Sequence, residues 1–267
     1  MEKLDVSVIL PVESSKHKDF TDYFTKAIVS INNQLTPVNE LVLVHSGEEY
    51  LETIINGFDF SGLTVNIVKN DGDTSFSSQV NLGVKNAKSK WISILEFDDE
   101  YASIWFKNVK EYMNAYPDYD GFLPLVVDVD STNTFVGFTN EATFAASMNM
   151  EIGILTNELL MSYQNFQSSG IVLKKSTFED FGGFKPSFEL TFVYEFLLRM
   201  TYNAAKLMTI PRIGYKHINL REGSIFWNYK NGTNLISEDE VRFWIESAKK
   251  EHFFVDDRGI KYEPTNV

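Results

Sequence analysis

The chain contains no cysteine among its 267 residues. This absence excludes disulfides, zinc–thiolate sites, iron–sulfur clusters and thiol catalysis, and it fits a reducing compartment. Basic residues are also few, because 24 Lys and Arg stand against 37 Asp and Glu, which leaves a formal net charge of −13. No run of clustered Lys and Arg is present, so direct binding of nucleic acid is disfavoured. An acidic protein can still bind a small polyanion where a divalent cation bridges the charges.

Long apolar runs are missing as well. No stretch of about 18 uncharged apolar residues occurs, so we expect no transmembrane helix. The first twelve residues, MEKLDVSVILPV, lack the long apolar core and small-residue cleavage site of a signal peptide. We therefore expect a cytoplasmic protein. Hydrophobic residues make up 43% of the chain, which is enough for the core of one large α/β domain spanning residues 1–267.

Short apolar runs alternate with amphipathic segments through the first hundred residues. The pattern predicts strands at 6–12, 40–44, 63–68 and 91–95, and helices at 19–34, 50–57 and 76–87. This alternation is typical of a doubly wound parallel sheet, which binds ligands outside the carboxyl ends of its strands. The loops that should line one crevice follow Val12, Val44, Val68 and Leu95.

The second half of the chain is less regular. The predicted strands there are 121–129, 170–174 and a strand-like run at 208–213. The predicted helices are 104–115, 176–181, 194–205 and 238–251. Gly182 and Gly183 should end the second of these helices. Residues 130–150 are polar and give no assignment, and 225–234 has the composition of a turn.

The strongest local signal is the acidic run Glu96-Phe97-Asp98-Asp99-Glu100, directly after the fourth predicted strand. Carboxylates at the end of a buried strand are costly unless they are paired or bind a metal. A hard divalent cation such as Mg²⁺ or Mn²⁺ would relieve their repulsion and bridge them to substrate phosphates. The alternative interpretation is a solvated acidic loop.

Several stretches, in this order and spacing, resemble the family 2 glycosyltransferases of the GT-A fold. They are VSVILPV at 6–12, AIVSINNQ at 27–34, ELVLV at 40–44, NLGVKNAK at 81–88, WISILEFDD at 91–99 and GGF at 182–184. The resemblance implies a Rossmann-like, mainly parallel sheet flanked by helices, with a less regular acceptor-side half. It divides the chain into a nucleotide-binding half at 1–100, an acceptor half at 101–225 and a C-terminal helical extension at 226–267.

The activity that the resemblance implies is transfer of a sugar from a nucleoside diphosphate, with a UDP-sugar favoured, to a hydroxyl of a glycan or other acceptor. Mn²⁺ or Mg²⁺ would lie near Asp99 and stabilise the departing diphosphate, with inversion at the sugar. Asp98 would share the metal or face the ribose. The nucleotide-binding candidates are Pro11, Val12, Glu13, His45, Asn81, Glu96 and Asp98.

Three positions depart from the family pattern. His45 follows the second strand where the family usually has an Asp, and it either binds the nucleobase or has no role. Val80 replaces an Arg that often precedes the equivalent of Asn81. Val193 stands six residues before Arg199, where the family has its catalytic Asp.

Glu195 is the nearest carboxylate after Val193 and is the predicted catalytic base, while Glu189 is an upstream alternative. An i,i+4 salt bridge between Glu195 and Arg199 is an equally weighted interpretation. If neither glutamate is the base, the chain would be a catalytically silent GT-A domain that binds a sugar or a protein partner.

His217 is a candidate metal ligand, although a structural role is also compatible with a single histidine. Arg221 and Lys216 could pair with the donor phosphates. An aromatic group near the C-terminus could form a sugar-stacking platform, pack in the core or make a dimer contact; it comprises Phe226, Trp227 and Tyr229. A sugar nucleotidyltransferase is disfavoured, because residues 11–15 lack the glycines of its phosphate loop.

Overall fold

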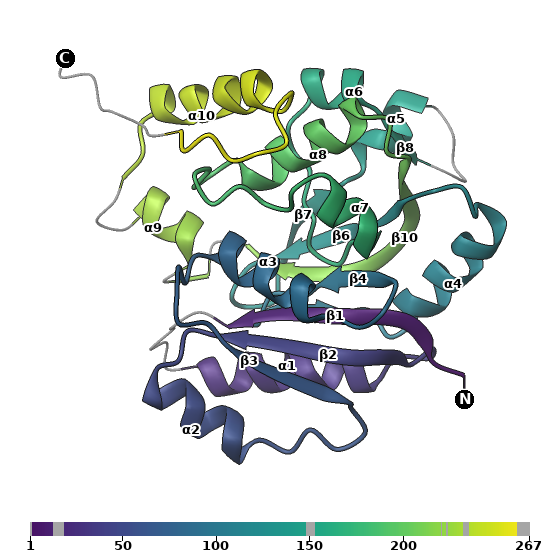
Figure 1. The fold of residues 1–267 in the computed structure, drawn as a ribbon, viewed down its shortest axis with the longest axis vertical. Helices are drawn as coiled ribbons and strands as arrows, with labels where there is room; N and C mark the ends of the chain where they lie inside the picture. The colour runs from purple at the N-terminus through teal and green to yellow at the C-terminus, as the bar shows by residue number, and fades with distance from the viewer. Residues whose placement is uncertain are drawn as a thin grey trace.

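A computed structural model describes residues 2–12, 19–147, 153–219, 221–222, 224–231 and 235–260. A ten-stranded sheet runs through the described part of the chain in the order β3-β2-β1-β4-β9-β6-β10-β5, with β7 added beside β6 and β8 beside β10 (Figure 1). The strands are β1 (Leu4–Val12), β2 (Val38–His45), β3 (Val65–Lys69), β4 (Trp91–Ile94), β5 (Glu100–Tyr101), β6 (Gly121–Val129), β7 (Phe135–Thr139), β8 (Gly153–Leu155), β9 (Val172–Lys174) and β10 (Leu207–Ile218).

The sheet is mainly parallel, as the sequence predicts. Strands β3, β2, β1 and β4 are parallel neighbours. Strand β9 is antiparallel to both β4 and β6, so β6 again points in the direction of β4, and β10 is parallel to β6. The carboxyl ends of β1, β2, β3, β4, β6 and β10 therefore share one edge of the sheet.

Helices cover both faces of the sheet. One face carries α1 (Phe20–Asn32), α2 (Glu49–Gly57) and α4 (Trp105–Ala115), whose apolar residues pack on Val6, Val8 and Leu10 of β1. The core of the other face is built from α3 (Phe76–Asn86), α6 (Asn157–Ser162), α7 (Lys175–Asp180), α8 (Phe192–Tyr202) and α10 (Glu238–Glu251). Because β1 is buried on both faces, its sequence is a continuous apolar run instead of an alternating one.

Local sequence signals explain several element boundaries. Ser237 and Glu240 form a capping box at the start of α10, and Ser75 caps α3 through the Ser78 backbone N–H. Gly182 and Gly183 follow α7 with φ values of 75° and 66°, a backbone conformation that favours glycine. The predicted helix terminator is therefore confirmed.

Two assignments differ from the sequence prediction. The strand-like run at 208–213 is part of a longer strand, β10, because its polar end pairs with β6 and β5. The turn predicted at 225–234 is wrong for residues 225–231, which form helix α9 (Ile225–Asn231). Seven residues are too few to display a helical repeat. Residues 135–139 and 142–147, which the sequence leaves unassigned, form β7 and α5 (Ala142–Ser147).

No helix in the described part of the chain combines the length and apolar character needed to cross a bilayer.

Candidate active site

The acidic run lies in the loop after β4, at the shared carboxyl edge of the sheet. The Leu95 N–H donates to the Ile9 carbonyl at 2.9 Å, which continues the β1–β4 pairing by one residue. The Asp99 N–H then donates to the Glu96 carbonyl at 3.2 Å and closes a tight turn. The Glu96 N–H donates to the Tyr215 hydroxyl at 3.0 Å, so the turn is also attached to β10.

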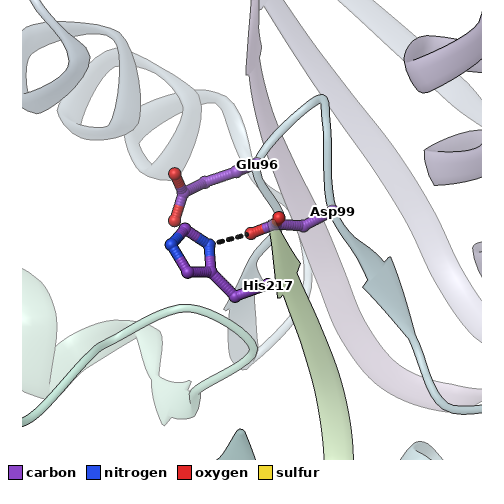
Figure 2. A group of neighbouring side chains, drawn as sticks. All are labelled: Glu96, Asp99 and His217. Atoms are coloured by element: carbon purple, nitrogen blue, oxygen red, sulfur yellow. Dashed lines mark hydrogen bonds and ion pairs between the residues drawn. The ribbon is translucent and has the colours of Figure 1, made fainter. Parts of the chain in front are cut away.

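Asp99 is fully buried and contacts the end of β10 through both carboxylate oxygens. Its Oδ2 lies 2.9 Å from His217 Nδ1, and its Oδ1 accepts from the Ile218 N–H at 2.9 Å (Figure 2). The side chain of His217 is 21% exposed. Two residues that are 118 positions apart in the sequence are thus joined at one point.

Glu96 completes a three-residue group around the imidazole (Figure 2). Ligand atoms of Glu96, Asp99 and His217 all lie within 4.8 Å of one another. Glu96 Oε1 also accepts a hydrogen bond from Ser169 Oγ at 2.5 Å. Two carboxylates and one imidazole are a donor set that suits Mn²⁺, and Mg²⁺ accepts the carboxylates.

The charges of this group are strongly coupled. Burial raises the pKa of Glu96 to about 7, with the negative charge of Asp99 adding to the effect. Burial lowers the pKa of His217, but the charge of Asp99 and the hydrogen bond to it outweigh burial and raise that pKa to about 10. At neutral pH a protonated His217 therefore compensates Asp99, and a divalent cation would have to displace that proton.

The neighbouring carboxylate, Asp98, forms a separate ion pair with Arg221. Arg221 Nε donates to Asp98 Oδ2 at 2.5 Å, and both side chains are buried. The guanidinium also lies over the ring of Phe97 at 4.9 Å. Burial and Asp99 raise the pKa of Asp98, while Arg221 lowers it. Arg221, a predicted phosphate partner, is thus paired with a carboxylate here.

Lys216, the other predicted phosphate partner, pairs with Glu100. Pro11 and Val12 are buried at the carboxyl end of β1, and Glu13 lies outside the described residues. His45 ends β2, where its Nδ1 accepts from the Gly47 N–H at 3.2 Å.

Two predicted site residues have internal partners away from the acidic run. The Asn81 amide donates to the Phe184 carbonyl at 2.7 Å and accepts from the Phe184 N–H at 2.9 Å. Both polar atoms of Asn81 therefore hold the glycine turn after α7. This geometry favours a structural role for Asn81 over a contact with a nucleotide.

Glu195 lies in a buried ion-pair group. Its Oε2 accepts from Arg199 Nη2 at 2.7 Å, which confirms the i,i+4 salt bridge, and its Oε1 lies 2.9 Å from Lys185 Nζ. All three side chains are at most 2% exposed. A carboxylate with both oxygens bound to buried cations is poorly suited to accept a proton from a substrate hydroxyl. The predicted role of Glu195 as catalytic base is therefore not supported by its surroundings.

Helix α9 lies beyond the carboxyl edge of the sheet (Figure 1). Its Tyr229 lines a cavity of about 600 Å³. Tyr229 of α9 donates to Glu189 Oε2 at 3.4 Å. The cavity is lined by Pro186, Ser187, Glu189, Tyr229, Leu235, Ile236, Glu240, Trp244, Gly259 and Ile260. Of the predicted aromatic platform, only Tyr229 lines the cavity, and the side chain of Phe226 lies outside the described residues.

Asp128 and Ser169 are site neighbours that the sequence analysis missed. Asp128, the penultimate residue of β6, is the register partner of His217, and Ser169 donates a hydrogen bond to Glu96. Asp128 could be predicted as a site residue once β6 is known to be parallel to β4, because ligands bind at the carboxyl ends of parallel strands. Ser169 has no sequence signal, because its partner lies 73 residues away.

Comparison with protein-family models finds a match over residues 7–172, to the model described as glycosyl transferase family 2. The chain belongs to this family. The match includes the acidic run, most of β1 and the whole of β2, β3 and β4. No curated protein matches the chain in sequence.

Solved structures of S. aureus TarS share the fold of this family 2 chain. TarS 1–349 in complex with UDP matches with a TM-score of 0.62 and 15% identity, covering 80% of this chain and 60% of that one. TarS 1–349 in complex with UDP-GlcNAc matches with a TM-score of 0.67 and 15% identity, covering 92% and 66%. The chain thus spans about 60% of the TarS 1–349 chain in the first of these matches, and the likeness establishes a GT-A fold.

Proposed function

We propose that this family 2 chain is a glycosyltransferase that transfers a sugar from a UDP-sugar to an acceptor hydroxyl, with Mn²⁺ or Mg²⁺ held by Glu96, Asp99 and His217. The observation that carries the proposal is this three-residue group at the carboxyl edge of a family 2 sheet. The UDP and UDP-GlcNAc complexes of TarS support UDP as the nucleotide.

The donor set fits the metal, because it offers two carboxylates and an imidazole from a rigid turn and a strand end. When bound, the metal would act as a Lewis acid on the diphosphate leaving group. Residues around the metal-binding group hold the nucleoside part of the donor. Asp98 faces the ribose, and Arg221 brings a positive charge beside the acidic turn. Pro11 and Val12 contact the nucleoside from the carboxyl end of β1, and His45 contacts it from the carboxyl end of β2. Glu13, which lies outside the described residues, is a further contact in this proposal.

The acceptor binds in the cavity beside α9, and Glu189 is the base in this proposal. Glu189 is an exposed carboxylate on the cavity wall, in contact with the Tyr229 hydroxyl. It can therefore reach solvent and a bound hydroxyl, unlike the buried Glu195. Attack by the deprotonated hydroxyl opposite the departing diphosphate would invert the configuration at the sugar.

The test is release of UDP from UDP-GlcNAc with Mn²⁺ and a panel of hydroxyl acceptors. We expect turnover by the wild type, loss of turnover in Asp99→Asn, and no change in Asp118→Asn, which removes an exposed carboxylate at the amino end of β6. Equal turnover by Asp99→Asn and wild type, or equal turnover in a chelator, would contradict the metal site.

The second candidate function is a catalytically silent domain that binds a nucleotide sugar. Val193 in place of an acid and the buried ion pairs of Glu195 favour it. It predicts metal-dependent UDP binding without turnover on any acceptor. Loss of turnover in Glu189→Gln with retained UDP binding would exclude the silent domain.

A further inference from the structure

Asp128 is a buried carboxylate that lacks a full set of partners. Its side chain is 5% exposed, and Oδ2 accepts a hydrogen bond from Thr139 Oγ1 at 2.7 Å. Oδ1 is buried and receives no hydrogen bond of ordinary geometry within the described part of the chain, although the Gln167 side chain lies close enough to offset part of the rise that burial causes in the pKa of Asp128. A buried carboxylate oxygen without a donor is unfavourable, so its presence indicates a ligand that supplies one.

Asp128 faces the metal-binding group. It is the register partner of His217 in the parallel pair β6–β10, so both side chains leave the same face of the sheet at its carboxyl edge. Burial raises the pKa of Asp128. The charge of His217 lowers it and that of Asp99 raises it, which agrees with this proximity. Asp128 itself is not one of the three residues, Glu96, Asp99 and His217, whose ligand atoms lie close enough together to hold one ion.

A polar segment links Asp128 to Glu96. Gln167 lies beside Asp128, and its buried Oε1 likewise has no hydrogen-bond partner among the described residues. Asn140 fixes the backbone of Gln167 in both directions: it accepts from the Gln167 N–H at 3.0 Å and donates to the Gln167 carbonyl at 3.2 Å. Two residues further along the chain, Ser169 Oγ donates a hydrogen bond to Glu96 Oε1. Asp128 Oδ1 and Gln167 Oε1 thus lie beside a hydrogen-bonded segment that leads to the metal-binding group.

The order of the strands indicates which part of the donor Asp128 and Gln167 would contact. The proposed nucleoside contacts lie at the carboxyl ends of β1 and β2, the metal-binding group joins the ends of β4 and β10, and Asp128 is the penultimate residue of β6. A donor lying along the edge with its diphosphate beside the metal-binding group would extend its sugar toward β6. Sugar hydroxyls donate hydrogen bonds, whereas a phosphate would be repelled by a carboxylate.

We infer that Asp128 and Gln167 bind hydroxyl groups of the sugar being transferred and thereby select the donor sugar. This inference rests on the proposed function, because it requires a nucleotide-sugar donor. A hydroxyl that donates to Asp128 Oδ1 would satisfy that oxygen, and a second hydroxyl would satisfy Gln167 Oε1. Both residues are binding residues, and no proton leaves the sugar.

The experiment compares the affinities of UDP and of UDP-GlcNAc, UDP-glucose and UDP-galactose, measured by calorimetry with Mn²⁺ on the full chain. In Asp128→Asn, we expect UDP affinity within about twofold of wild type and about tenfold weaker binding of the preferred UDP-sugar, the effect of losing one charged hydrogen bond. Gln167→Ala should reduce the discrimination among the three sugars. Asp118→Asn is the charge-matched control and should change neither affinity.

Retained UDP binding in Asp128→Asn also shows that the variant is folded. Equal weakening of UDP and UDP-sugar would overturn the inference, since Asp128 would then serve the metal, the diphosphate or the fold. Unchanged affinity for every sugar would overturn it as well. Absence of UDP binding by the wild type is a distinct result, which would refute the proposed function and with it this inference.

Discussion

Replacing Glu195 by Gln tests whether this carboxylate is structural or catalytic. Glu195 lies between Arg199, at 2.7 Å, and Lys185, at 2.9 Å, and is fully buried. The substitution keeps the shape of the side chain but leaves two buried cations without their counter-charge. Breaking a buried pair in this way costs about 3–5 kcal/mol. Since whole domains are stable by only about 5–15 kcal/mol, the variant should be strongly destabilised.

The assay is thermal unfolding, in which a loss of this size lowers Tm by roughly 10 °C for a chain of this length. Glu179→Gln is the matched control, because Glu179 forms an i,i+4 pair with Lys175 at 3.5 Å but is 49% exposed. That surface pair should contribute at most about 1 kcal/mol. A Glu195→Gln variant that melts at the wild-type temperature and has lost only turnover would refute the structural assignment and restore Glu195 as the base.

Three further outcomes follow from the site. Asn81→Ala should lose about 2 kcal/mol of stability, because the Phe184 backbone loses two hydrogen bonds, while UDP affinity stays unchanged; chemical denaturation and calorimetry measure the two effects. In the metal-free fold, Glu96 and His217 have pKa values of about 7 and about 10, above the ordinary values of 4.5 and 6.5. Their contribution to stability is therefore present at low pH and declines as pH rises through these values, which melting curves across pH should show. Because Mn²⁺ competes with the same protons, its affinity should rise with pH, and a pH-independent affinity would exclude these ligands.

The first half of the fold could be predicted because its signals are local. Strand β1 is buried on both faces and is therefore a continuous apolar run, and α1 has a clear apolar face. Strand β10 was underestimated because Lys216 and His217 interrupt its apolar pattern. Their pairing with β6 and the acidic turn, not their own propensity, extends the strand.

The site could be predicted only where the residues that form it are adjacent in the sequence. The acidic run identified the turn, and His217 was a candidate that the fold brings to Asp99. The partner of Arg221 is a carboxylate 123 residues away, and no local pattern indicates it. Asp128 was missed because the direction of β6 depends on the short antiparallel strand β9 beside it.

The metal-binding group is tested most directly by calorimetric titration of UDP into wild type and Asp99→Asn, with and without Mn²⁺, after melting curves establish that both are folded. We expect UDP to bind the wild type only with Mn²⁺ and the variant to lose this binding, because Asp99 is the buried carboxylate common to the turn and the His217 contact. UDP binding of equal strength without metal, or binding unchanged in Asp99→Asn, would contradict the assignment of Glu96, Asp99 and His217 as the metal-binding group.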